Sequence, residues 1–530
     1  MTPSERRLHP VSILFSLGGS LKALALPAVL LFFGTRSSRP RGGPWDFVDF
    51  VPGNMEAWAL WLLIPATIVS VLRYFTFRMR YEGTELVIRS GLLFRNERHI
   101  PYDRIQNLNA IRNVFHRMLG MTDVQIETAS GQAAEAKISV VPLAVLDEMR
   151  ERVFAGRARA SAAGDADAPA APAARELLRL PFSELALLSV IQNRGLLPIA
   201  ALFGLLWEFG LLDRVSDLLG SDTLFGGGVV RNAAQGILLG RVDLWQVAGA
   251  IATIVGAVVF VQLLSLAWAV TRLHGFRLVQ AGEDLRTSYG LLTQVATTVP
   301  MRRIQSITVE QGPLQRLVGR VAVRVETAGG GGVPTSGMSA DFAEGTRGAS
   351  RQWLAPIVPA DRLPALLHAV LPDFEPELLH WQGPHPRAFR RALKKDLVLA
   401  ALISSAVFSA LATTFGTWAL VLLPLVPVWT VVVTRQQVRR LAWGMSEPIV
   451  GFRSGWLWQR TVLARTAKIQ VVTRAESPFD RRTGMGRVRV DTAGGGDWSA
   501  RVDIPYLARD VADGLYARLA ARAASTEFRW

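Results

Sequence analysis

The stretch that decides the fold runs from Gly290 to Gly330 and reads GLLTQVATTVPMRRIQSITVEQGPLQRLVGRVAVRVETAGG. The same pattern starts at Gly91 and again at Gly455. When the first glycine is called position 0, every copy has a basic residue before Ile-Gln at position 13 and Arg at position 26. Gly follows at position 29, an acid before Thr-Ala at position 36 and Gly at position 40. Three copies without a gap identify internal repeats.

Each repeat has the same predicted order of elements. Apolar runs flank the first glycine, which predicts two strands joined by a tight turn. A strand with the basic residue, Ile and Gln follows, and then a short helix that ends at the glycine of position 29. After one more strand come closing apolar helices, predicted at residues 142–154, 359–371 and 505–519. This order predicts a small antiparallel sheet or barrel capped by a helix, and each repeat is expected to fold as a separate unit.

The motifs of the middle repeat resemble a known family. Gln-Gly-Pro-Leu-Gln-Arg at residues 311–316 and Val-Glu-Thr-Ala-Gly-Gly at residues 325–330 are similar to those of the bacterial pleckstrin-homology-like (PH-like), membrane-flanked domain family. The resemblance implies a seven-stranded barrel with a C-terminal helix, several copies per chain, in a bacterial plasma-membrane protein. The third repeat departs from the pattern, because Arg465 stands where the other repeats have Pro101 and Pro300.

The composition indicates a membrane protein. Half of the 530 residues are hydrophobic, and the mean hydropathy is +0.25. The absence of cysteine excludes disulfides, a thiolate nucleophile and cysteine metal sites. The net charge of +16 is typical of proteins that bind nucleic acid or anionic lipid. Because Arg clusters lie beside apolar stretches, we expect membrane lipid, and not nucleic acid, as a partner.

Apolar stretches between the repeats predict six membrane spans in three hairpins. The predicted fold is therefore a multi-pass α-helical membrane protein with three PH-like β-barrels, each closed by a C-terminal helix. The hairpins are placed at residues 1–72, 176–270 and 374–434, the PH-like domains at 73–156, 271–373 and 435–530, and a linker at 157–175. The two longer hairpin loops are neutral or carry −2, so the excess positive charge lies on the repeats. By the positive-inside rule, the PH-like domains are predicted to be cytoplasmic in the cell membrane.

No sequence pattern points to catalysis. The seven histidines are scattered and show no metal-ligand spacing. The glycine-rich stretches at residues 329–332 and 494–496 lack the Lys-Ser/Thr of a phosphate loop, and turns explain them better. We expect no enzyme activity, no catalytic residue, no metal and no cofactor.

The candidate binding face comes from positions 13 and 15 of the repeats. In a strand these two side chains share one face. They are Arg104, Gln106, Arg303, Gln305, Lys468 and Gln470. One interpretation is structural, with each basic residue paired across strands to the acid at position 36, namely Glu127, Glu326 or Asp491. The other is a face that binds lipid phosphate or a carboxylate of a partner.

Two functions are open at this point. The first is a non-enzymatic plasma-membrane protein whose three PH-like domains act as binding or assembly modules for proteins, for another copy of the chain or for anionic lipid. The alternative is a transporter of small solutes or lipid with regulatory PH-like domains. A transporter is expected to place polar groups midway along several spans, and the predicted spans have few. We therefore favour the first function.

Overall fold

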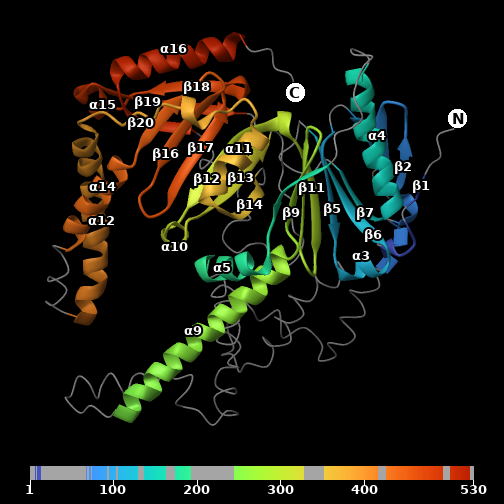
Figure 1. Cartoon of the computed structure of the whole chain (residues 1–530), viewed down its shortest axis with the longest axis horizontal. Coiled ribbons are helices and arrows are strands. Elements are labelled where there is room, and N and C mark those ends of the chain that lie inside the picture. The colour runs from blue at the N-terminus through green and yellow to red at the C-terminus, as the bar shows by residue number, and fades with distance from the viewer. Residues whose placement is uncertain are drawn as a thin grey trace, which may run out of the picture.

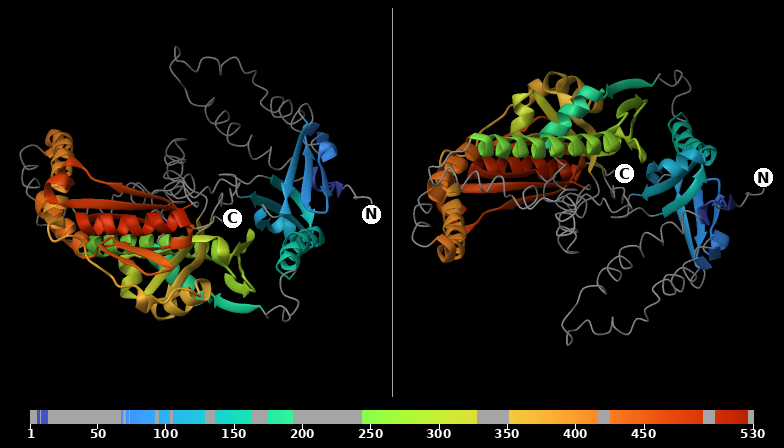
Figure 2. Two further views of the ribbon diagram at one scale, coloured as in Figure 1. Left: turned by 90° about the horizontal axis from the view of Figure 1, so that it is seen from above. Right: turned by 90° about the horizontal axis from the view of Figure 1, so that it is seen from below.

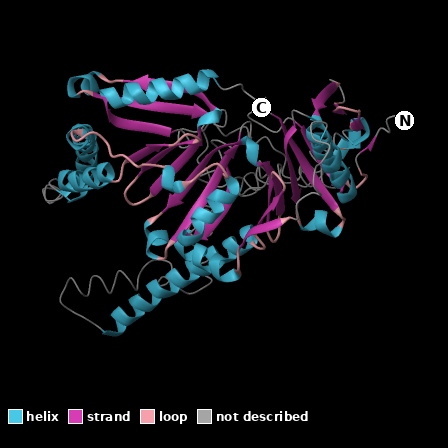
Figure 3. Ribbon diagram, turned by 45° about the horizontal axis from the view of Figure 1, so that its top comes forward, coloured by secondary structure: helices cyan, strands magenta, loops and turns pink. Residues whose placement is uncertain are grey.

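The computed structural model describes residues 74–91, 95–102, 105–128, 136–162, 174–192, 244–327, 351–415, 425–492 and 502–525, with short pieces within 6–13 and 67–72. Strands form the centre of the molecule, and helices lie around them (Figure 3). In Figure 1 the first repeat is at the right and the third repeat at the upper left.

Each repeat consists of two groups of three antiparallel strands, here called its first half and its second half. The first halves are β2 (Arg78–Tyr81), β3 (Glu85–Ser90) and β4 (Asn96–Pro101); β9 (Arg277–Ala281), β10 (Asp284–Tyr289) and β11 (Gln294–Pro300); and β15 (Ala442–Met445), β16 (Ile449–Ser454) and β17 (Gln459–Arg465). The second halves are β5 (Ile105–Arg112), β6 (Met121–Thr128) and β7 (Ala136–Pro142); β12 (Ile304–Gln311), β13 (Arg320–Thr327) and β14 (Arg351–Pro359); and β18 (Ile469–Ala475), β19 (Met485–Thr492) and β20 (Val502–Ala508). Short leading strands, β1 (Arg6–Arg7) and β8 (Arg175–Arg179), precede two of the repeats.

A short helix separates the first two strands of each second half. These helices are α3 (Val114–Met118), α10 (Pro313–Leu317) and α15 (Pro478–Thr483). The Asn113 and Ser477 side chains cap α3 and α15 by accepting the backbone N–H of the third helical residue, while Pro313 starts α10 with a φ suited to a helix. Each repeat is followed by a longer helix: α4 (Leu143–Ala162), α11 (Leu363–Val370) or α16 (Arg509–Ser525).

The sheets do not stay within single repeats, so the three predicted PH-like domains are not structurally separate from one another. In the described residues, one sheet has the order β7-β6-β5-β11-β10-β9-β8, and another has the order β14-β13-β12-β17-β16-β15. The second half of each of the first two repeats is thus hydrogen-bonded to the first half of the next. The physical reason is that an edge strand has unpaired N–H and C=O groups, which a strand of the next repeat can satisfy.

The hydrophobic cores follow the sheets across the repeat boundaries. The largest core contains Phe276, Leu278 and Ile307 of the middle repeat together with Ile449 and Leu463 of the third. Likewise, Ala296 of the middle repeat packs against the core of the first. Because neighbouring repeats share buried surface, the described repeats form one connected body and are not independent units.

The prediction of six spans in three hairpins is also wrong for this structure. Among the described residues, one helix is long and apolar enough to cross a membrane, namely α9 (Leu244–Leu273), over Val247–Leu273. The first predicted hairpin and the stretch 196–207 lie almost wholly outside the described residues.

The other described helices explain why hydropathy alone was misleading. Helix α5 (Phe182–Gln192) buries Leu185 and Leu188 in the protein core, so its apolar residues serve packing. Helix α14 (Leu425–Arg439) has only 15 residues. Helix α12 (Ala388–Phe415) begins with a strongly charged segment that contains Arg390, Arg391, Lys394, Lys395 and Asp396. An apolar stretch in the sequence can therefore belong to a helix packed in the core, to a short helix or to a helix with a charged start.

Replacing the first glycine of a repeat is expected to destabilise the protein. Gly455 has φ +92°, and a Cβ there would lie 1.9 Å from the Trp458 carbonyl oxygen. We expect Gly455→Ala to destabilise the protein by more than about 1 kcal/mol, because both the backbone conformation and the close approach exclude a side chain. The control is Gly514→Ala in α16, where a Cβ meets nothing within 4 Å and the change should stabilise by up to about 1 kcal/mol. Thermal unfolding of both variants in detergent measures the difference, and equal melting temperatures would contradict it.

Candidate functional site: the joints between repeats

Two joints connect the repeats, β5 with β11 and β12 with β17, and both have the same register. In each, the residue at position n of one repeat faces position 25 − n of the next. Arg112 faces Gln294 in the first joint, and Gln311 faces Gln459 in the second, so position 21 is opposite position 4 both times. An identical register in two places shows that the joint is a repeated feature of the fold.

The arginine at position 26 holds the joints together. Arg117 Nη1 donates a hydrogen bond to the Leu291 carbonyl oxygen at 2.9 Å, and Arg316 Nη2 donates to the Trp456 carbonyl oxygen at 3.2 Å. Each acceptor is the residue after the first glycine of the next repeat. The sequence pattern contained this arginine without revealing its partner, because the bond joins residues more than a hundred positions apart.

The helix α9 ends at the same turn. The backbone N–H of Gly290 donates to the His274 carbonyl at 2.9 Å, and that of Leu291 donates to the Thr271 carbonyl at 3.0 Å. In the next repeat, the Trp456 ring lies 6.2 Å from the Trp429 ring of α14. The turns, the short helices and the C-terminal end of α9 therefore lie along one margin of the molecule. In Figure 1, α3, α5 and α10 follow the lower margin of the sheets, from which α9 extends downward.

Large apolar side chains are exposed along this margin, which we call the apolar edge. It consists of α3, α10 and the turns 290–293 and 455–458. Met118 is 78% exposed, Leu317 83% and Trp458 72%, and Phe115 and Leu292 are more than half exposed. Repeated exposure of such residues at equivalent places is unusual for a surface in contact with water and indicates an interaction surface.

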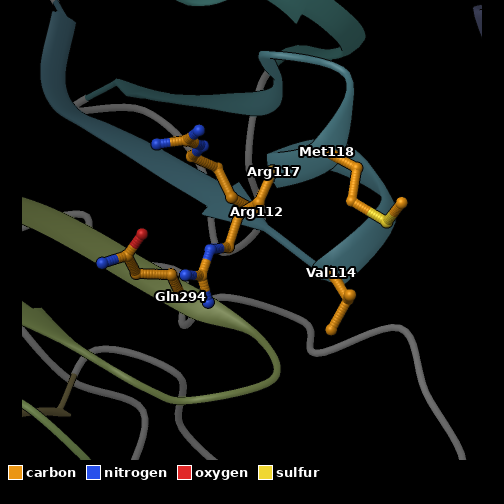
Figure 4. Close-up of a pocket in the computed structure, with 5 residues that line it drawn as sticks. All are labelled: Arg112, Val114, Arg117, Met118 and Gln294. Carbon is orange, nitrogen blue, oxygen red and sulfur yellow. The ribbon is translucent and has the colours of Figure 1, made fainter.

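A groove opens in the apolar edge at the first joint (Figure 4). Its lining is Arg112, Val114, Arg117 and Met118 from the first repeat and Gln294 from β11. Arg112 Nε is buried and has no hydrogen-bond partner among the described residues. Two guanidinium groups beside apolar side chains form a setting suited to an anionic group with an aliphatic tail.

The residues of the candidate binding face, at positions 13 and 15, differ in burial between the repeats. In the middle repeat Arg303 and Gln305 are buried, and Arg303 Nη1 donates to the Ile105 carbonyl of the first repeat at 3.3 Å. In the third repeat Gln470 is exposed and Lys468 is half-buried. Arg104 and the side chain of Gln106 lie outside the described residues. The acid at position 36, Glu326, accepts a hydrogen bond from Ser306 Oγ at 2.9 Å. A binding role for these six residues stays a prediction.

Basic residues from two repeats meet at the start of β12. Burial lowers the pKa of Lys468, and the nearby guanidinium groups of Arg465, Arg302 and Arg303 lower it further. Burial also lowers the pKa of Arg465, whose Nη1 donates to the Met301 carbonyl at 3.2 Å. This cluster and the apolar edge lie at opposite ends of β12, which spans about 25 Å at about 3.3 Å per residue. The cluster is thus distant from the groove.

Within the described part of the chain, no group of three or more His, Asp or Glu side chains is placed to hold a metal ion. The expectations of no metal, no cofactor and no enzyme activity stay predictions.

Comparison with known proteins agrees with the repeated architecture. A family model described as the bacterial PH domain matches residues 21–157, 235–352 and 396–523, more than half of the chain. The chain belongs to the bacterial PH domain family. The resemblance inferred from the motifs is therefore confirmed, and so are the three internal repeats. The chain is 24% identical over 499 residues to the UPF0699 transmembrane protein YdbT of Bacillus subtilis (strain 168). The aligned region covers 91% of each protein. No solved structure matches the chain.

The register of the bacterial PH repeats can be tested by disulfide formation, because the chain has no cysteine of its own. Thr308 and Val462 are directly opposite each other in the second joint. Opposite residues of antiparallel strands lie about 4.5 to 5.5 Å apart at Cα, within disulfide range. All three positions used here are buried, so labelling is done after denaturation. We expect Thr308→Cys/Val462→Cys to form an intramolecular disulfide, so that a maleimide reagent added to the denatured protein labels neither thiol until reduction. The matched control Thr308→Cys/Leu463→Cys places the thiols on opposite faces, and equal protection in both variants would contradict the register.

Proposed function

We propose that this chain is a membrane-attached binding and assembly protein whose PH repeats rest with the apolar edge on the lipid surface and bind anionic head groups in the joint groove. The observation that carries the proposal is that α9 ends at the turn of the apolar edge. A membrane crossed by α9 would bring that turn, α3 and α10 to the lipid interface. The relative YdbT is named a transmembrane protein, which supports attachment to a membrane.

The energetics favour contact with lipid over exposure to water. Burying a large apolar side chain is worth about 1.5 to 3 kcal/mol, and the apolar edge has several such side chains. A basic residue near an anionic membrane surface contributes about 1 kcal/mol. The groove supplies Arg112 and Arg117. Because the cytoplasmic leaflet carries the anionic lipids, these arginines favour that leaflet for the contact.

The repeats act through the surfaces that they present. The basic cluster around Lys468 lies at the far end of β12 and would remain accessible to a protein partner. The transporter alternative has no specific contact among the described residues in its favour.

The proposed orientation predicts different environments at the two ends of β10. Leu292 lies in the turn of the apolar edge, and Glu283 lies in the turn at the other end; both are exposed. A fluorophore sensitive to polarity, attached to Leu292→Cys in the full chain in lipid nanodiscs, should be blue-shifted and protected from iodide quenching. The same probe on the matched variant Glu283→Cys should be quenched freely. Equal quenching at both sites would refute the orientation.

The groove predicts a preference for anionic lipid. We expect Arg112→Gln to lower the affinity for phosphatidylglycerol by about 1 kcal/mol, or about fivefold, because one head-group contact is lost. The control is Arg302→Gln, an exposed arginine at the far end of β12. The measurement is the phosphatidylglycerol retained per purified chain, determined by mass spectrometry. If both variants retain the wild-type amount, the groove is not a head-group site.

A further inference from the structure

Among the described residues, the first repeat and the third repeat each contain one strand that is unpaired on one side, although the equivalent strands of the other repeats are paired in the two joints. Strand β18 is the counterpart of β5 and β12, and β4 is the counterpart of β11 and β17. The four counterparts form the two joints. In the described residues, however, β18 is hydrogen-bonded only to β19 and β4 only to β3.

Burial shows what the open edge leaves uncovered. Val471 of β18 is 54% exposed, whereas its counterpart in the paired strand β12, Ser306, is 2% exposed. Gln470 is exposed, whereas Gln305 is buried. Along β4, the four residues Asn96 to His99 are all exposed. Both strands therefore carry a surface that the joints bury in the other repeats.

We infer that β18 of one copy of this chain pairs with β4 of a second copy, antiparallel and in the register of the two internal joints. The two edges cannot meet within one chain, because the first repeat (blue) and the third repeat (orange and red) lie at opposite ends of the molecule in Figures 1 and 2. This inference is independent of lipid binding.

The charges of the two edges fit this register. Position 19 facing position 6 puts Arg474 opposite Glu97, and position 21 facing position 4 puts Glu476 opposite Arg95. Opposite charges on facing residues stabilise antiparallel strands, and like charges destabilise them. A shift of two residues in one direction puts Glu476 opposite Glu97, and a shift in the other direction puts Arg474 opposite Arg95. Only the register of the internal joints pairs both acids with arginines.

These groups have partners within the chain at present, since Arg474 pairs with Glu476 and Asp513, and Glu97 pairs with Arg89. When two copies pair, each of these charged groups would either keep its present partner and gain a second one or replace it with a partner of opposite charge from the other copy. A similar ion pair already spans the second joint, where Arg460 Nη2 lies 2.9 Å from Glu310 Oε1.

The arginine at position 26 of the third repeat supports the same conclusion. Arg481 is the counterpart of Arg117 and Arg316, which donate across the joints to the residue after the next first glycine. Its side chain is exposed and has no partner among the described residues. In a second copy, the equivalent acceptor is the carbonyl that follows Gly91.

The plain alternative is that charges on β4 simply prevent aggregation, as they do on many edge strands. Protective charges on two edges need no relation to each other. Here they are complementary in the one register that the joints use. Head-to-tail pairing of this kind repeats along a series of copies and gives a ring or an open chain.

Cysteine pairs in the full chain, in native membranes, test the inference. Thr473→Cys/Arg98→Cys occupies positions 18 and 7, the positions of Thr308 and Val462 in the second joint. Mild oxidation should convert the monomer into a ladder at multiples of 58.0 kDa that collapses on reduction. The matched control Thr473→Cys/His99→Cys keeps the four edge charges, places the thiols on opposite faces and should stay monomeric. The variant Thr308→Cys/Val462→Cys, whose disulfide lies within one chain, shows that oxidation was effective.

Charge reversal gives an independent measurement. Glu97→Arg in the Thr473→Cys/Arg98→Cys background faces Arg474 and should abolish most of the ladder, and adding Arg474→Glu should restore it. The inference is overturned if the internal pair oxidises while the Thr473→Cys/Arg98→Cys variant stays monomeric. It is equally overturned if Thr473→Cys alone forms dimers, because β18 would then pair with β18, or if the disulfide joins this chain to a different protein. None of these outcomes bears on the groove or on Arg112.

Discussion

The structure depends on the pairing of strand edges between consecutive repeats. An open edge has backbone N–H and C=O groups that lose their hydrogen bonds to water when anything covers them. At β5 and at β12 these groups are paired with a strand of the next repeat. The pairing brings two halves of different repeats into one sheet, and their cores become continuous as a consequence. A chain of small domains thereby gains the buried surface of a larger one.

This constraint also explains why equivalent residues have different environments. Positions 13 and 15 are buried in the middle repeat, where β12 has neighbours on both sides, and are more exposed in the third, where β18 has one. A residue type retained at one position of a repeat can therefore support packing in one copy and remain available in another. Arg303 contacts the backbone of the preceding repeat, whereas Lys468 lies among cations with a lowered pKa.

The local elements could be predicted from the sequence. The glycine of the first turn and the glycine at position 29 that ends the short helix each act within a few residues, and both have positive φ in all three repeats. The joints could not be predicted, because they connect strands far apart in the chain and no local pattern marks an edge as paired. Hydropathy alone also could not separate α5, which is apolar because it packs in the core, from α9, whose apolar side chains are exposed. The groove at Arg112 depends on the first joint and was missed for the same reason.

The joints also determine where the apolar edge lies. In each joint the short helix of one repeat is bound, through the arginine at position 26, to the first turn of the next. The exposed side chains of α3 and Leu292, and those of α10 and Trp458, are brought together by this contact. The edge is thus not a property of one PH repeat, since it is assembled at the boundary between two. Helix α15 carries the exposed Phe479, and no first turn of another repeat is bound to it among the described residues. A further joint in the same register would place the first turn of a neighbouring copy beside it and continue the edge in the same way.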